Sequence, residues 1–494
     1  MVKCVHQRVR KRFFGRGGTN YFFSNYVTDY VKKGIFMLEK VFDLFNGFIG
    51  LGGAAMMFIV LTLLSLLFGV KLGKSIEGGF RMAIALTGMS AIISLLSSSF
   101  SPALQSFVES TGIQLKITDL GWAPLAVITW GSIYTLYFAT ICISLNLIYL
   151  YLKITNTLNV DLFNIWNVSI IGLLVSYYSH SFLLTSIFVL LIYTAMLLNA
   201  DAMKPTLNKV LDFDDNNITT TAHPSFLIAP VLMVINKIID FCLPFIDKYD
   251  FDADTLNEKI GFWGSKFAIG GYLGVFIGIL GKENLTDIFI LAFTGGVALE
   301  LFSIVGGWFG PAIEPLSGGV QAFMAKSLRG RKLYIGIDWP IVASRSELWA
   351  VANILAPILL FIAIVLPGNK VMPLGGILMT VLVPALLVVT HGRVIRMTLI
   401  GTIIIPIYLW SATKIANFIS NTSEQMGNLP DGMTKGQLFT SVDSNPIGKL
   451  IALTLGEGFG NQNLVKILIA IIAIVAYALL FIWYRKQLQV NLEK

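Results

Sequence analysis

The sequence predicts an all-α, polytopic membrane protein, and two observations support this prediction. Of its 494 residues, 55% are hydrophobic and only 13% are charged, about half the charged fraction of an ordinary soluble domain. Long apolar runs also recur along the chain, as at 58–68, 377–389 and 465–484. A helix needs about 20 apolar residues to cross a bilayer, and by this rule roughly ten to twelve segments qualify. A large soluble helical protein is therefore disfavoured.

The charges indicate membrane topology rather than nucleic-acid binding. The net charge is +8, and the basic residues gather at segment ends and in the tails, where they act as anchors and topology signals. The basic extension 1–38 lacks the features of a removable signal peptide. The three cysteines (Cys4, Cys142 and Cys242) are too scattered for a disulfide framework or a zinc site. We expect no cofactor, no bound metal and no nucleic acid.

Four short motifs occur twice, in the same order, and indicate an ancestral duplication. The pairs are GVKLGK (69–74) with GILGK (278–282), TG (87–88) with TG (294–295), SSSFSPAL (97–104) with GGWFGPAI (306–313), and TDLGWAP (118–124) with YIGIDWP (334–340). Glycine and proline are common in membrane helices, so one such match could arise by chance. A conserved order of four matches is much harder to explain in that way.

Charge predicts that the two copies have opposite orientations. The loop after the second motif proline carries four basic residues: Lys326, Arg329, Arg331 and Lys332. The equivalent loop of the first half carries only Lys116, together with Glu109. Under the positive-inside rule the two loops lie on opposite sides of the membrane. An inverted-topology repeat of this kind is typical of alternating-access transporters.

The elements follow from hydropathy. A first span is expected near 46–69, and long apolar stretches follow at 122–152 and 168–199. The stretches 86–104 and 293–313 are short, rich in glycine and serine, and interrupted by proline. They are interpreted as re-entrant hairpins, which occur where irregular backbone lines a polar cavity; a kinked, tilted helix is the alternative.

These segments divide the chain into five parts. They are a basic extension (1–38), a first membrane repeat (39–211), a connector with the helix following His223 (212–265), a second membrane repeat (266–419), and an extramembrane loop with a final transmembrane helix (420–494).

Polar residues within the apolar segments are the candidates for function, because burying them in a membrane is costly. Asp119 and Asp338 occupy equivalent repeat positions, each beside a tryptophan and a proline. A carboxylate next to an aromatic ring such as Trp122 is suited to binding a sugar or polyol. The alternative is that both carboxylates cap helix N-termini, and the two roles are compatible.

Further candidates come from three other segments. His223, followed by proline, is suited to hydroxyl binding or proton transfer, and Glu314 follows the second motif proline. Asn159 and Asp161 belong to the polar run 156–167. This run forms either a wall that binds hydroxyl groups or a tightly hydrogen-bonded turn.

Five segments together resemble one known family. They are DLGW (119–122), NVDLFNIW (159–166), AHPS (222–225), GIDWP (336–340) and LPGNKVMPLG (366–375). From about residue 40 to 485, the chain resembles the galactitol-type membrane component IIC of the bacterial phosphoenolpyruvate-dependent sugar phosphotransferase system. This component belongs to the ascorbate–galactitol superfamily. Family members often have glycine where this chain has Pro224, and SRSE (344–347) is more charged than expected.

The resemblance implies about eleven transmembrane helices with two re-entrant hairpins, arranged as an inverted-repeat, elevator-type transporter. It also implies a homodimer in the cytoplasmic membrane, in contact with lipid. The substrate would be a polyol or sugar, carried inward and phosphorylated by the phosphocysteine of a separate IIB protein, with a IIA protein upstream. His223 would then bind substrate and serve as the catalytic base, with Asp119 and Asp338 in matching motif positions.

Other functions remain open from the residues alone. An ion-coupled secondary transporter of a small polar solute could use Asp119 and Asp338 as proton or sodium sites. A membrane scaffold is a third possibility, which the paired acids disfavour. Galactitol is the family label, but arabitol, other pentitols and hexitols, or a ketose also fit the sequence. Because the phosphoryl donor is a separate subunit, whether this chain alone counts as an enzyme is open.

Overall fold

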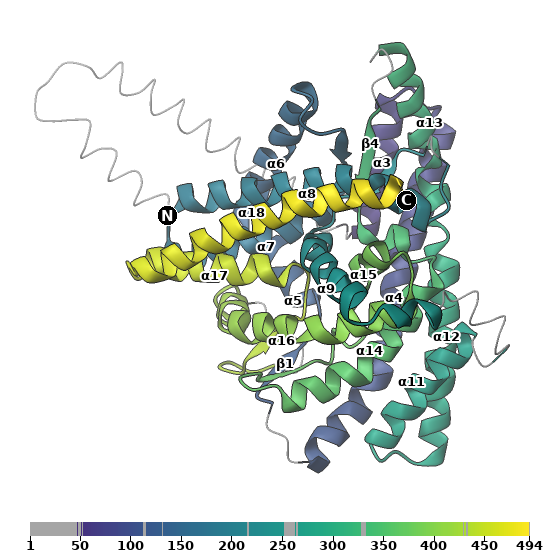
Figure 1. The fold of residues 1–494 in the computed structure, drawn as a ribbon, viewed down its shortest axis with the longest axis vertical. Coiled ribbons are helices and arrows are strands. Elements are labelled where there is room, and N and C mark those ends of the chain that lie inside the picture. Colours follow the sequence, from purple (N-terminus) through teal and green to yellow (C-terminus); the bar gives the residue numbers. More distant parts are fainter. Residues whose placement is uncertain are drawn as a thin grey trace, which may run out of the picture. The chain divides into compact units, whose positions relative to one another are not determined.

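A computed structural model describes residues 53–493, apart from 112–114, 131, 215–216, 251–261, 263–264, 328–331, 428 and 431–432, together with positions 47 and 51. Residues Leu51–Lys494 form one compact unit. The described part is mostly helical, in agreement with the predicted fold class (Figure 1). The predicted extension 1–38 and the basic residues Arg329 and Arg331 lie outside the described residues.

The first half of the chain contains helices and three short strands. In order they are α3 (Gly53–Leu67), α4 (Leu72–Thr111), β1 (Ile117–Asp119), α5 (Ala123–Trp130), α6 (Ile133–Tyr151), β2 (Thr157–Asn159), α7 (Leu162–Ser179), α8 (Phe182–Val210), β3 (Thr219–Thr221), η1 (Pro224–Ile228), α9 (Ala229–Cys242) and η2 (Pro244–Lys248).

The second half follows a closely similar order. Its elements are α11 (Lys266–Leu280), α12 (Leu285–Gly306), α13 (Phe309–Ser327), β4 (Tyr334–Ile337), η4 (Trp339–Val342), α14 (Ser346–Val365), β5 (Val371–Met372), α15 (Val383–Thr390), α16 (Val394–Gln425), β6 (Phe439–Thr440), α17 (Pro446–Gly460) and α18 (Leu464–Glu493). The helices after β2 and β5 even end alike, at His180 and His391, each in the left-handed conformation.

The six strands form two parallel sheets that exchange strands between the halves. In one sheet, which we call sheet A, β1 of the first half lies between β5 and β6 of the second. In the other, sheet B, β4 of the second half lies between β2 and β3 of the first. When β1, β2 and β3 are matched in order with β4, β5 and β6, the strand order of sheet A, β5-β1-β6, becomes that of sheet B, β2-β4-β3. The sequence did not predict these strands, because each has only two to four residues and lacks a readable alternation.

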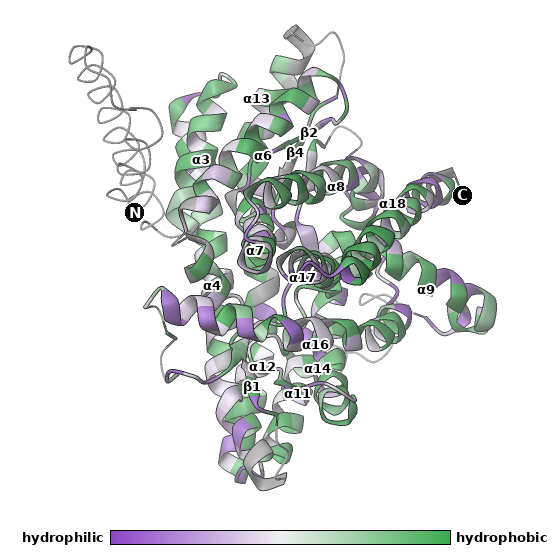
Figure 2. Cartoon of the chain, turned by 90° about the vertical axis from the view of Figure 1, so that its left-hand side faces the viewer, coloured by the Kyte–Doolittle hydropathy of each residue, from purple (hydrophilic) through white to green (hydrophobic). Residues whose placement is uncertain are grey.

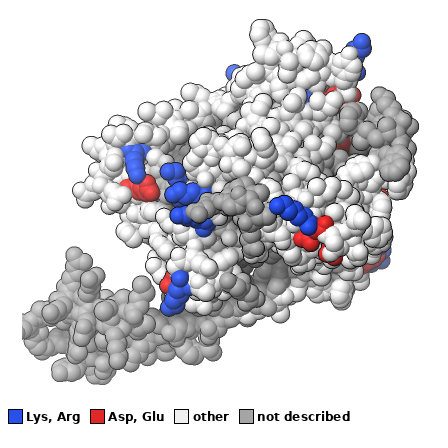
Figure 3. All heavy atoms as spheres, turned by 90° about the horizontal axis from the view of Figure 1, so that it is seen from below, with Lys and Arg blue, Asp and Glu red and all other residues white. Residues whose placement is uncertain are grey.

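Six helical segments in the described residues are long and apolar enough to cross a membrane: Tyr134–Tyr151, Phe182–Val210, Pro224–Cys242, Ser346–Val365, Val394–Gln425 and Leu464–Val490. The long helices are hydrophobic over most of their length in Figure 2. α18 exposes large apolar side chains such as Leu468, Ile472 and Leu479. In the view of Figure 3, acidic and basic residues form a few small groups separated by uncharged surface. Such a surface is suited to contact with lipid.

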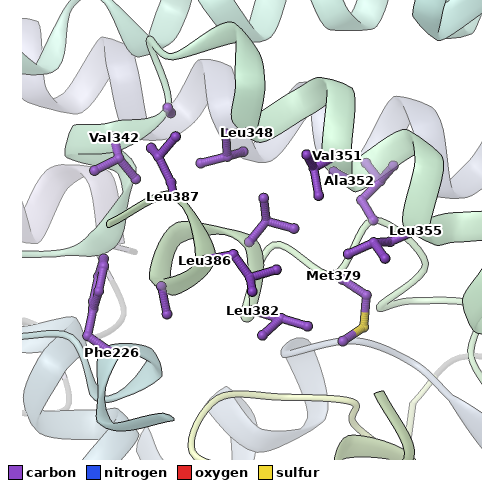
Figure 4. Packing of buried hydrophobic residues seen from close by; sticks show 14 of the residues in the cluster. Phe226, Val342, Leu348, Val351, Ala352, Leu355, Met379, Leu382, Leu386 and Leu387 are labelled. Carbon is purple, nitrogen blue, oxygen red and sulfur yellow. The ribbon is translucent and has the colours of Figure 1, made fainter. Parts of the chain in front are cut away.

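An apolar core packs α14 against α15 and η1 (Figure 4). Leu348 and Leu355 of α14 and Leu386 of α15 are each fully buried. Phe226 of η1 is also fully buried and belongs to the same cluster. These contacts hold the segment after β3, which includes His223, against helices of the second half.

The predicted hairpins differ between the halves. α4 continues as one helix through Pro102, so the chain does not break there. In the second half, the chain breaks between α12 and α13, shortly before Pro311. α4 packs against both of these helices. A proline kinks a helix without ending it when neighbouring helices compensate for the lost hydrogen bond.

Two polar stretches are more ordered than their composition suggested. The composition of 420–446 predicts an extramembrane loop, but α16 extends to Gln425, 439–440 form β6, and the buried segment 441–445 leads into α17. Within the predicted connector, 219–221 form β3 of sheet B. Threonine, serine and asparagine satisfy their hydrogen bonds by joining sheets and capping helices, so their polarity did not indicate exposure to solvent.

Candidate functional site

The end of β1 holds Asp119, which is fully buried. Its Oδ1 accepts hydrogen bonds from the backbone N–H groups of Gly121 (2.9 Å) and Val442 (3.0 Å). Its Oδ2 accepts from Gly376 N–H at 2.6 Å. Burial raises the pKa of Asp119 to about 6, although the three N–H donors oppose the rise. The carboxylate therefore joins the strand of one half to two segments of the other.

Two glycines allow the chain to surround Asp119 closely. Gly121 has a positive φ of 71°, which favours glycine. A Cβ on Gly375 would lie 2.1 Å from the backbone nitrogen of Gly121. Only glycine at position 375 allows this approach, and Gly375 N–H donates to the carbonyl oxygen of Asp119 at 2.9 Å.

The end of β4 holds Asp338 beside two residues of the first half. Its backbone N–H donates to Asp161 Oδ2 at 3.0 Å, and its own Oδ1 accepts from Trp339 N–H at 2.7 Å as the N-cap of η4. Asp161 caps α7 by accepting from Phe163 N–H at 2.8 Å. Burial raises the pKa of Asp161 to about 6. Burial and the neighbouring Asp161 raise the pKa of Asp338 well above its usual value.

His223 follows β3 and lies next to Asp338 in sheet B. Its Nδ1 lies 2.7 Å from Ser225 Oγ, and its Nε2 lies 3.1 Å from Asn167 Nδ2. Burial lowers the pKa of His223 to about 3, so the ring is neutral. The distance of 3.6 Å between Nε2 and Asp338 Oδ1 is therefore not an ion pair. Nδ1 also accepts from the backbone N–H of Ser225 at 3.2 Å, so that His223 caps η1.

Asn159 forms hydrogen bonds that stabilise a turn within the first half. Its Oδ1 accepts from Asn164 Nδ2 at 2.9 Å, its Nδ2 donates to Tyr193 OH at 3.1 Å, and its backbone N–H donates to Asn146 Oδ1 at 2.9 Å. These bonds support the tightly hydrogen-bonded turn, which was one of the two interpretations of the run 156–167.

The other two predicted residues lie apart from these contacts. Trp122 is 46% exposed, and its ring centroid lies 6.4 Å from that of Trp166. Glu314 is exposed on α13. Thus the fold brings Asp161, His223 and Asp338 together and places Asp119 at the equivalent end of sheet A.

The segment between β6 and α17 also contributes to the site, although its sequence did not predict this. Ser444 Oγ donates to Asn167 Oδ1 at 3.0 Å, which connects this segment through Asn167 to His223. Asp443 and Lys449 form a buried ion pair, and Asp443 acts electrostatically on both Asp119 and His223. The available signal was the polar run TSVDSN (440–445) before a proline.

The polar groups at these sites are suited to a neutral, hydroxyl-rich ligand. Neutral imidazole, amides and hydroxyl groups bind hydroxyl groups without requiring a charge on the ligand. Among the described residues, no group of three or more histidine, cysteine, aspartate or glutamate side chains could hold a metal ion.

The chain is similar to known proteins over most of its length. Residues 47–434 match the family described as "PTS system sugar-specific permease component". The "PTS system galactitol-specific EIIC component" of Escherichia coli (strain K12) is 26% identical over 447 residues, which cover 90% of this chain and 96% of that protein. The protein of the same description from Escherichia coli O157:H7 has the same identity and coverage.

Proposed function

The chain belongs to the family of sugar-specific permease components of the phosphotransferase system, and from this premise we propose that it carries a galactitol-like polyol inward while the polyol is phosphorylated. It is a multi-pass protein of the cytoplasmic membrane and a component of a sugar phosphotransferase system. The galactitol-specific relatives, similar over nine-tenths of the chain, support a polyol as the substrate.

The observation that carries the proposal is the buried network around His223. Through Asn167, His223 is connected to Ser444, which lies in the second half. The neutral imidazole and the carboxylate of Asp338 would bind hydroxyl groups of the polyol. Because a general base works best with a pKa near the working pH, the low pKa of His223 favours substrate binding over the base role in the resting protein.

The phosphoryl group would come from the phosphocysteine of a separate IIB protein, which a IIA protein recharges. In this transfer the S–P bond of the phosphocysteine breaks, an O–P bond forms on the polyol, and the hydroxyl proton is released. Of the two cysteines in the described residues, Cys142 is buried and Cys242 is exposed. Neither lies in a sequence context typical of a phosphocysteine loop.

The two halves would form an inverted repeat that moves in elevator fashion. The exchange of strands between the sheets and the recurring element order support this proposal. We extend it to about eleven transmembrane helices, a re-entrant hairpin at the break between α12 and α13, and a homodimer, as inverted-repeat transporters of this kind combine broken helices with a central site.

The proposal is tested in inverted or right-side-out vesicles that contain the purified chain. Labelled galactitol is supplied with phosphorylated IIB, with unphosphorylated IIB, or with an imposed proton or sodium gradient. We expect phosphorylated galactitol only in the first condition. Accumulation of free polyol driven by an ion gradient would instead establish the ion-coupled secondary transporter.

A further inference from the structure

The chain places a capping residue followed by proline at equivalent points of the two sheets. After β3, His223 precedes Pro224, and its ring accepts from Ser225 N–H at 3.2 Å. After β6, Asn445 precedes Pro446, and its Oδ1 accepts from Gly448 N–H at 3.0 Å. Each capping residue follows a strand that flanks the central strand of the other half. Asn445 is therefore the structural counterpart of His223.

Asn445 has a conformation that its capping role alone does not explain. It lies in the left-handed region with a φ of 52°, whereas a residue that caps a helix N-terminus usually has an extended backbone. It is 4% exposed, and its Nδ2 has no hydrogen-bond partner in the described structure. An unsatisfied buried donor is destabilising, and such exceptions cluster at ligand-binding positions.

Neighbouring contacts connect Asn445 to the network around His223. The preceding residue, Ser444, donates to Asn167, and Asn167 also contacts His223 Nε2. The ion pair between Asp443 and Lys449 spans Asn445 and joins the loop to the first turns of α17. The segment is thus connected through Asn167 to the first-half site.

We propose that Asn445 is a second hydroxyl-binding residue of the polyol site, with its Nδ2 group donating to a substrate hydroxyl. This inference rests on the proposed function and extends it. A linear polyol carries hydroxyl groups along its whole length, so it is suited to contact His223 from one half and Asn445 from the other. A single donated hydrogen bond gives specificity for the presence of one hydroxyl.

The test uses Asn445→Gly in the full-length protein. Glycine tolerates a positive φ and an N-cap position, so this variant removes the amide with little strain. Asn461→Gly at the exposed C-terminal end of α17 is the matched control. Binding of galactitol, sorbitol, mannitol and arabitol to purified protein is measured by calorimetry, with thermal unfolding as the check of folding.

We expect Asn445→Gly to weaken binding of the preferred polyol about tenfold and Asn461→Gly to leave it within about twofold of the wild-type value. A series of monodeoxy polyols should include one whose affinity is unchanged by Asn445→Gly, a result that a purely structural role does not give. If Asn445→Gly binds every polyol as the wild type does while His223→Ala loses binding, the inference is wrong and the proposed function stands. If the wild type binds none of these polyols, both are overturned.

Discussion

The backbone N–H of Asp338 donates to the carboxylate of Asp161 at 3.0 Å, and this bond joins the two halves of the chain in sheet B. The same carboxylate also caps α7 through Phe163 N–H. A single buried side chain therefore fixes the start of a helix in the first half and the end of a strand in the second. If β4 moves relative to α7, this hydrogen bond must break. If the bond stays intact, β4 and α7 must move together.

We predict that Asp161→Ala strongly destabilises the protein. The substitution leaves two partly buried N–H donors, those of Phe163 and Asp338, without an acceptor, and each costs about 1–3 kcal/mol. Thermal unfolding in detergent should show a clear decrease in midpoint temperature, whereas Asp214→Ala, at an exposed position, should leave it unchanged. An unchanged midpoint for Asp161→Ala would show that the bond between the halves contributes nothing to stability.

Asp161 also predicts a dependence of stability on pH. Its pKa is raised from 3.8 to about 6 in the folded protein, so the folded state binds more protons than the unfolded state between these values. The stability that it contributes is fully present below pH about 4 and is lost as pH rises through about 6. The wild-type midpoint should therefore fall over this range more steeply than that of Asp161→Asn. Equal slopes would contradict the raised pKa.

Sequence and structure agree best where an apolar run is long. Runs such as 465–484 predicted membrane-spanning helices, because about twenty consecutive apolar residues fit few other structures. The pairing of Asp119 with Asp338 also came from the sequence, since each lies two residues from a glycine and precedes a tryptophan and a proline. In the structure Asp338 caps η4, as the capping alternative predicted. The carboxylate of Asp119 instead accepts from N–H groups of three separate segments.

The sheets and the segment 441–449 could not be predicted in the same way. Strands of two to four residues are too short for a periodic signal, and their partners lie in the other half of the chain. The polar residues Asp443 and Ser444 suggested an exposed loop, but both are buried. Asp443 pairs with Lys449, and Ser444 donates to Asn167 of the first half. Such compensation depends on tertiary structure, which local composition does not encode.

Gly375→Ala should be among the most disruptive single-methyl substitutions in sheet A. The added Cβ would lie 2.1 Å from Gly121 N, so β1 and the segment after β5 would separate and Asp119 would lose its bond to Gly376. We expect a loss of folded protein on size-exclusion chromatography. Gly318→Ala on α13 is the control, because nothing lies within 4 Å of its Cβ and alanine favours a helix. A well-folded Gly375→Ala protein would show that this close approach is not required.

His223→Asn should weaken polyol binding with little change in stability. Asparagine is a good N-cap and replaces the capping acceptor of the ring, but its shorter side chain cannot reach the position of Nε2. We expect at least a tenfold loss of affinity, a difference of about 1.4 kcal/mol, in equilibrium binding of labelled galactitol. His180→Asn, at the exposed end of α7 where asparagine tolerates the left-handed conformation, should bind as the wild type does. Wild-type affinity in His223→Asn would remove His223 from the site.

The buried ion pair between Lys449 and Asp443 gives a final prediction with two readouts. Lys449→Met leaves Asp443 buried and unpaired, which should destabilise the protein by about 3–5 kcal/mol. The double variant Asp443→Asn with Lys449→Met should recover most of this loss, because no buried charge remains. Lys466→Met, in a partly exposed pair with Glu457, should change stability by less than about 1 kcal/mol. The positive charge of Lys449 lowers the pKa of His223, and Asp443 raises it. The single variant should therefore raise the pKa of His223, as measured by NMR of labelled histidine, and the double variant should bring it back toward the wild-type value. A single variant as stable as the wild type would show that Asp443 takes up a proton or water when its partner is lost, and the ion pair would then not hold the segment before α17 in place.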